Sequence, residues 1–154
     1  MREYIVSTLF LLWLPVSPAQ TVPADWSNVA DSKGLCQISV PPEWTLLPDT
    51  KGTAVFRDAT TAIAVVTSQP GQAFKPLSVP LQRVLDISKE SLFENSAKRV
   101  FYQERVSRNA ETPGALSASV PGKDGTCSCR VTFLPSVSAE TAKKIVLSLS
   151  AVRE

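Results

Sequence analysis

The chain has 154 residues, 44% of them hydrophobic and 19% charged, which is the composition of an ordinary globular protein about one domain long. It contains no histidine. This absence excludes Ser-His-Asp and Cys-His catalysis, histidine-ligated zinc and histidine-ligated haem. The formal net charge of +2 is too small to indicate nucleic acid as a partner.

The start of the chain has the pattern of an export signal. Arg2 provides the positive charge, residues 4–14 form an apolar run, and residues 17–19 place small side chains at a cleavage site. The apolar run is about half as long as the roughly 20 residues that cross a bilayer; an N-terminal membrane anchor is the alternative. We therefore interpret residues 1–19 as a signal peptide and expect a soluble secreted or periplasmic protein, without stable membrane insertion after cleavage.

Residues 20–34 form a polar lead-in segment, and a strand pattern begins after it. Cys36, Ile38 and Val40 alternate with polar residues and share one face of the predicted strand. Two prolines end this strand, because proline cannot donate a hydrogen bond to a sheet. Trp44 lies in a short second strand, and we expect its side chain to anchor the core rather than to bind a ligand.

A hairpin and then a helix are predicted in the middle of the chain. Residues 54–57 and 62–67 are short strand patterns on either side of a turn. The segment 69–80, with three prolines, is typical of a crossing loop. An apolar stripe at helical spacing then predicts an amphipathic helix that ends near Asn95, and the stripe consists of Leu81, Val84, Leu85 and Leu92. Three carboxylates spaced four apart are interpreted as the solvated face of this helix, not as a catalytic cluster: Asp86, Glu90 and Glu94.

The C-terminal half returns to alternating patterns. Residues 100–106, 116–120 and 126–133 each predict a strand, and the segment 121–125, with its proline and two glycines, predicts a turn between the last two. The final strand has the most regular alternation in the chain. These patterns predict a largely antiparallel sheet, because hairpin turns connect neighbouring strands.

The chain ends in a helical pattern. Ser138 is a favourable N-cap, and apolar residues then recur at helical spacing as far as Val152. Strands linked by hairpins and separated by helices indicate an α+β domain, a largely antiparallel β-sheet with packed helices. We assign residues 35–154 to this single domain.

The opening strand carries a resemblance to a known superfamily. The segment Leu35-Cys-Gln-Ile-Ser-Val-Pro-Pro-Glu-Trp44 is similar to the strand, proline and tryptophan signature of the PsbP-like superfamily. That group includes the photosystem II extrinsic subunit, a nuclear Ran-binding protein and many bacterial exported proteins of unknown role. The order of predicted elements over residues 35–152 agrees with it. The resemblance implies a PsbP-like α/β/α sandwich and a binding or assembly role without catalysis, and it implies no particular functional residue.

Three cysteines are the candidates for a disulfide. Cys36, Cys127 and Cys129 lie on the apolar faces of two predicted strands, and cysteines exported to an oxidising compartment tend to pair. A bridge from Cys36 to either of the other two is more reasonable than one between Cys127 and Cys129, which would close an unfavourable small ring. Three unpaired core cysteines, a thiol redox or copper(I) site, and intermolecular pairing are the alternatives. Because the count is odd, at least one thiol stays outside any intramolecular bridge.

A basic segment offers a candidate partner surface. Alternation places Arg99, Phe101, Gln103 and Arg105 on one side of a predicted strand. Such a row could bind an acidic partner or an anionic headgroup, whereas the alternative is a solvated strand face.

These patterns favour an exported, soluble, non-catalytic binding or assembly module of the cell envelope. Its partner would be another envelope protein or a small ligand held beside the sheet, and no cofactor is expected. One alternative is a thiol-based redox or metal-handling protein that uses Cys127 and Cys129. The other is an enzyme that uses carboxylates in a pocket the sequence does not reveal.

Overall fold

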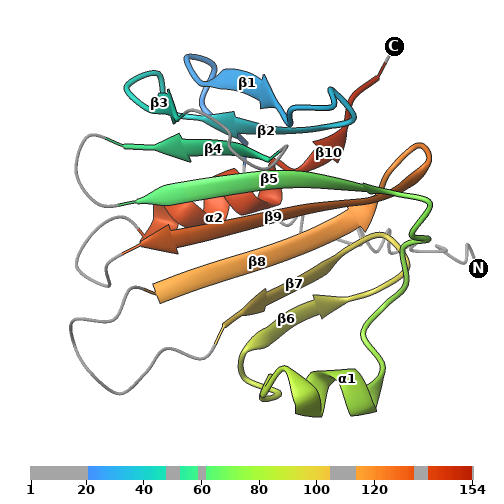
Figure 1. The fold of residues 1–154 in the computed structure, drawn as a ribbon. Coiled ribbons are helices and arrows are strands. Elements are labelled where there is room, and N and C mark those ends of the chain that lie inside the picture. Colours follow the sequence, from blue (N-terminus) through green and yellow to red (C-terminus); the bar gives the residue numbers. More distant parts are fainter. Residues whose placement is uncertain (1–20, 48–52, 59–61, 105–113, 134–138, 154) are drawn as a thin grey trace, which may run out of the picture.

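The structure, a computed structural model, describes residues 21–47, 53–58, 62–104, 114–133 and 139–153 (Figure 1). In this part of the chain the strands form a seven-stranded sheet, in the order β3-β4-β5-β9-β8-β7-β6, and a three-stranded sheet, in the order β1-β2-β10. In chain order the elements are β1 Ser27–Ala30, β2 Cys36–Val40, β3 Thr45–Leu47, β4 Ala54–Arg57, β5 Ile63–Pro70, α1 Val79–Val84, β6 Leu92–Asn95, β7 Val100–Gln103, β8 Gly114–Pro121, β9 Gly125–Phe133, α2 Ala139–Leu147 and β10 Ser150–Ala151.

All strand pairs in both sheets are antiparallel, as the sequence predicted. The long strands β5, β9 and β8 lie side by side in the large sheet. Along β9, Cys127, Cys129, Val131 and Phe133 are buried, while polar residues occupy the alternate positions. The predicted turn after β8 is also present, because the amide of Gly122 donates to the carbonyl of Gly125 over 2.8 Å.

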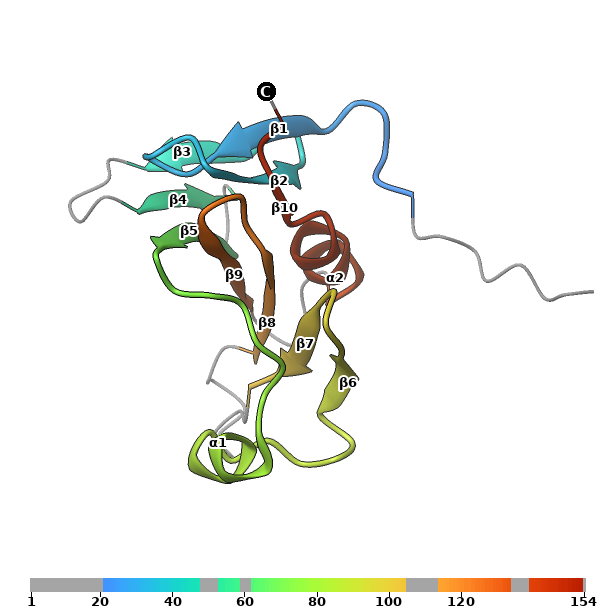
Figure 2. The ribbon, with the colours of Figure 1, turned by 90° about the vertical axis from the view of Figure 1, so that its right-hand side faces the viewer.

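The helix α2 covers one face of the large sheet. Its residues Ala142, Ile145 and Val146 are buried against the strands. Figure 2 shows α2 against this face, whereas the segment that leaves β5 passes over the opposite face on its way to α1. The helix α1 has no buried residue. The fold is therefore a sheet-rich α+β arrangement in which helix packing is limited, compared with the expected α/β/α sandwich.

The prediction of a helix that ends near Asn95 is wrong. The helix α1 has six residues and ends at Val84, and Asp86 then adopts a left-handed backbone with φ of 54°. Leu92, the last residue of the expected stripe, instead opens β6, which pairs with β7. The remaining stripe residues, Leu81, Val84 and Leu85, are exposed. Since Glu94 lies on β6, the three carboxylates do not share one helix face.

The two ends of the domain meet in the small sheet. The segment expected as a polar lead-in contains β1, which pairs with β2, while Trp26 and Val29 pack against the core. The last helix ends at Leu147 instead of continuing to Val152, because Ser150–Ala151 form β10 on the other edge of β2. The expected N-cap, Ser138, lies outside the described residues.

Within the described residues, no helix is both long and apolar enough to cross a membrane. The segment interpreted as a signal peptide, residues 1–19, lies outside them.

Candidate functional site

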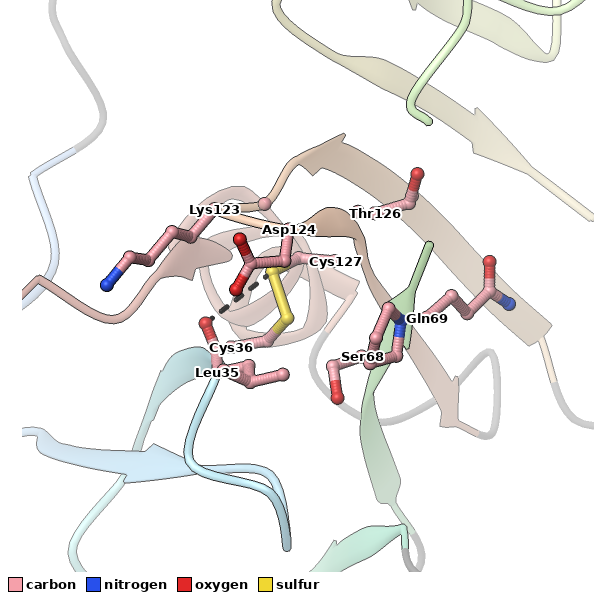
Figure 3. A pocket seen from close by; sticks show the side chains of 11 residues that line it. Leu35, Cys36, Ser68, Gln69, Lys123, Asp124, Thr126 and Cys127 are labelled. Atoms are coloured by element: carbon pink, nitrogen blue, oxygen red, sulfur yellow. Dashed lines mark hydrogen bonds between the residues drawn. A yellow bond between two sulfur atoms is a disulfide. The ribbon is translucent and has the colours of Figure 1, made fainter. Parts of the chain in front are cut away.

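The first candidate site surrounds a disulfide between the two sheets. Cys36 on β2 is bonded to Cys127 on β9, with sulfur atoms 2.02 Å and Cα atoms 5.6 Å apart. Both residues are almost completely buried. Figure 3 shows the bond beneath the β8–β9 turn, where Lys123 and Asp124 lie. Of the pairings that the sequence left open, the structure has the one between these two cysteines.

The space beside this disulfide is too small for a ligand. Its volume is about 10 Å³, and it is lined by the turn together with the end of β5, including Ser68 and Gln69. A cavity of that size holds about one water molecule. The sulfur of Cys127 lies 3.8 Å from the carbonyl oxygen of Leu35, but a disulfide sulfur has no proton to donate. This region therefore serves as a covalent joint between strands.

The third cysteine is a buried thiol. Cys129 lies on β9, two residues after the bridge, and burial raises its pKa to about 12. Because the thiolate is the reactive form of cysteine, this thiol is unreactive at neutral pH. Among the residues that the structure describes, no group of three or more His, Cys, Asp or Glu side chains could hold a metal ion.

A buried carboxylate next to the bridge was missed by sequence reasoning. One oxygen of Asp31 accepts hydrogen bonds from the amides of Leu35 and Cys36, over 2.8 and 3.0 Å. The other accepts one from the hydroxyl of Ser68 over 2.6 Å. Burial acts to raise the pKa of Asp31, but these hydrogen bonds together lower it below the usual value of 3.8. The spacing Asp31-x-x-Gly34, with Gly34 at φ of 68°, is the turn signal that could have revealed this residue.

The row expected as a partner surface does not form one exposed face. Phe101 is buried in the core, whereas Gln103 is exposed. Arg99 donates to the carbonyl of Leu147, at the end of α2, over 3.3 Å, and its guanidinium lies 3.8 Å from the carboxylate of Glu94. The side chains of Arg99, Phe101 and Gln103 do lie on one side, but that side faces α2. The fourth member, Arg105, lies outside the described residues.

A second candidate site is a pocket between the start of α2 and the large sheet. We call it the phenylalanine pocket, because Phe93, Phe101 and Phe133 line it together with Leu116. Its volume is about 400 Å³. The rings of Phe93 and Phe101 have centroids 4.9 Å apart and are tilted by 42°, which is a favourable aromatic contact.

The register of the sheet explains how this pocket forms. Gln103 on β7 pairs with Leu116 on β8, and Leu116 pairs with Val131 on β9. Side chains alternate along strands, so Phe101, Leu116 and Phe133 all emerge on the face that α2 covers. The first turn of α2, from Ala139, completes the lining.

Three polar side chains stand at the phenylalanine pocket. They are the amide of Gln103, the carboxylate of Glu140 and the ammonium of Lys143. Within the described part of the chain, none of these three side chains makes a hydrogen bond or an ion pair. The pocket therefore combines an apolar interior with polar groups that are available to a ligand, as small-molecule sites commonly do.

Comparisons with known proteins show which fold the chain has. No protein-family model matches the sequence, and no curated protein matches it. The solution structure of cyanobacterial PsbP (CyanoP) from Synechocystis sp. PCC 6803 matches with a TM-score of 0.53 at 12% identity, covering 88% of this chain and 98% of that one. The chain has a PsbP-like fold.

A crystal structure from Bacteroides thetaiotaomicron VPI-5482 matches with a TM-score of 0.52 at 16% identity. The match covers 81% of the present chain but only 47% of that protein, so the chain spans about half of its length. At these identities the likeness is one of fold. The PsbP-like scaffold therefore transfers no functional residue, and the phenylalanine pocket has to be judged on its own chemistry.

Proposed function

We propose that the protein is an exported, non-catalytic binding module that holds a small apolar ligand in the phenylalanine pocket. The observation that carries this proposal is the pocket itself, in which three phenylalanines line an open space of about 400 Å³. Ligand pockets of folded proteins usually measure about 300–1,000 Å³ and combine aromatic walls with a few polar groups. Of the two partners expected from the sequence, an envelope protein and a small ligand beside the sheet, this pocket favours the ligand.

Two features support export. Residues 1–19 have the charge, apolar run and small-residue cleavage site of a signal peptide. The buried Cys36–Cys127 bond is of the kind that persists in oxidising compartments. The proposed location is therefore secreted or periplasmic.

The thiol-based alternative has less support. Thiol exchange and soft-metal binding both require an accessible sulfur that can exist as a thiolate. Cys127 is held in the buried bridge, and burial of Cys129 raises its pKa to about 12. Neither sulfur of the proposed Cys127 and Cys129 pair meets the requirement.

The proposal can be tested with N-phenyl-1-naphthylamine, a neutral aromatic probe whose fluorescence rises in apolar surroundings. We expect saturable binding at one site per chain. Ala139 is exposed and lines the pocket, so Ala139→Trp should fill the space without removing core atoms. We expect this variant to weaken probe binding at least about tenfold, the effect of losing one or two buried contacts between probe and protein.

The matched control is Ala24→Trp, which places the same side chain at another exposed alanine, on the segment before β1. It should bind the probe as the unmodified protein does. Equal binding by Ala139→Trp and Ala24→Trp would show that the probe does not occupy the phenylalanine pocket and would overturn the proposal.

A further inference from the structure

We infer that the ligand of the phenylalanine pocket carries an anionic group and that Lys143 binds this group. The inference rests on the proposed function, because it concerns the ligand class of the same pocket. The predicted class is an aromatic or similarly bulky apolar molecule with a carboxylate, sulfonate or related anion.

The position of Lys143 supports this inference. The side chain is half-buried, lines the pocket and has no ion pair or hydrogen bond within the described residues. A lysine stem packs well along apolar surface, but its ammonium requires water or an anion. A ligand with its apolar body among the phenylalanines and an anion at the rim would satisfy both ends of the side chain.

The dipole of α2 does not account for a charge at this position. Glu140 lies in the first turn of α2 and Lys144 in the last turn, where the helix dipole favours a negative and a positive charge respectively. Lys143 lies in the middle of the nine residues, beyond the first turn where the dipole acts on side chains. The helix dipole therefore gives no reason for a positive charge at this position.

The other polar groups at the pocket set the geometry of the bound anion. Glu140 also lines the pocket, three residues before Lys143, and its negative charge would repel an anion placed beside it. Gln103 stands on β7, and its amide is a donor for the same anion. We therefore expect the anionic group between Lys143 and Gln103, with the rings of the ligand against Phe101 and Phe133.

A matched pair of probes tests the inference. 8-Anilinonaphthalene-1-sulfonate has the same ring system as N-phenyl-1-naphthylamine and adds one sulfonate. Lys143→Met keeps the apolar stem and removes the charge. We expect this variant to weaken sulfonate binding about three- to fivefold, the range of a partly exposed ion pair, and to change binding of the neutral probe by less than about twofold.

Lys144→Met is the matched control, because Lys144 is the neighbouring residue and does not line the pocket. It should leave the affinities for both probes unchanged. If the neutral probe binds and Ala139→Trp blocks it, but Lys143→Met does not weaken sulfonate binding, the proposed function stands and this inference is overturned. If the neutral probe does not bind in the pocket at all, the proposed function and the inference both fail.

Discussion

Asp31 connects three segments of the chain through one buried carboxylate. Its oxygens accept the amides of Leu35 and Cys36, at the start of β2, and the hydroxyl of Ser68, at the end of β5. A buried carboxylate is stable only when hydrogen bonds replace its lost water. The acid group therefore fixes the ends of β2 and β5 in the two sheets beside the disulfide.

This arrangement predicts a specific dependence of stability on pH. Burial opposes the charged form of Asp31, but its hydrogen bonds lower its pKa below 3.8 overall. The resulting stabilisation is fully present above pH 3.8, the usual pKa, and is lost as the pH falls through the lower pKa of the folded protein. We expect Asp31→Asn to lower the free energy of unfolding by about 1–3 kcal/mol at pH 7, and its stability to fall less steeply in acid than that of the unmodified protein.

Urea unfolding measured from pH 7 to pH 2.5 checks this prediction. Ser68→Ala is the graded control, because it removes one hydrogen bond to the carboxylate and keeps both amide donors. Ser68→Ala should lower the free energy of unfolding by about 0.5–1.5 kcal/mol. If the free energies of unfolding of Asp31→Asn and the unmodified protein fell in parallel with decreasing pH, the stabilising role of the Asp31 carboxylate would be contradicted.

At the scale of elements, the contact between β5 and β9 depends on a glycine. Gly125 begins β9 opposite Pro70, and a Cβ atom at this position would collide with the backbone carbonyl of Gln69. The amide of Gly71 donates to the carbonyl of Asp124 in the adjoining turn over 2.7 Å. The two strands therefore approach closely at a place where any side chain on Gly125 would push them apart.

Gly125→Ala should lower the free energy of unfolding by about 1–3 kcal/mol, the usual cost of overpacking against backbone. Asp124→Ala is the control in the same turn, since the side chain of Asp124 is exposed. It should change stability by less than about 0.5 kcal/mol. Chemical denaturation of both variants measures the difference. If Gly125→Ala were as stable as Asp124→Ala, the backbone of β5 would move to accommodate the methyl group without loss of stability.

The elements that the sequence predicted well are those whose pattern follows one period without interruption. Along β9 the alternation identified the buried face that includes Cys129 and Val131. The predicted helix after residue 80 failed because its helical spacing combined residues of α1 with Leu92, which pairs with β7 instead. The helical spacing of Leu92 from the other stripe residues was therefore a coincidence over a short window, and hydrogen bonding between β6 and β7 determines the structure there.

The phenylalanine pocket could not have been predicted from the sequence. Phe93, Phe101 and Phe133 lie on three different strands, and the pocket also needs the first turn of α2. These three side chains come together only because of the strand order in the sheet, and no local pattern in the sequence specifies that order. The alternation that linked Phe101 to Gln103 was correct, but one strand cannot show which layer covers its face.

At the scale of the whole molecule, the disulfide joins the small sheet to the large one. Cys36 lies on β2, the central strand of the three-stranded sheet, and Cys127 lies on β9, the central strand of the other (Figure 1). Beside the bridge, within the small sheet, the amide of Val152 next to β10 donates to the carbonyl of Leu35 next to β2 over 2.9 Å. Residues 91 positions apart are thereby linked at the point where both ends of the domain meet.

Removal of this bond should therefore affect the stability of the whole domain. In the chain-entropy description, closing a loop of 91 residues lowers the entropy of the unfolded chain and stabilises the folded state by about 4–5 kcal/mol. We expect Cys36→Ala with Cys127→Ala to lose most of that free energy in chemical denaturation. Cys129→Ala removes a cysteine from the same buried face but no bond, and it should cost about 1–2 kcal/mol for the lost contacts. If the double variant were no less stable than Cys129→Ala, the link between the sheets would be held by packing and hydrogen bonds alone.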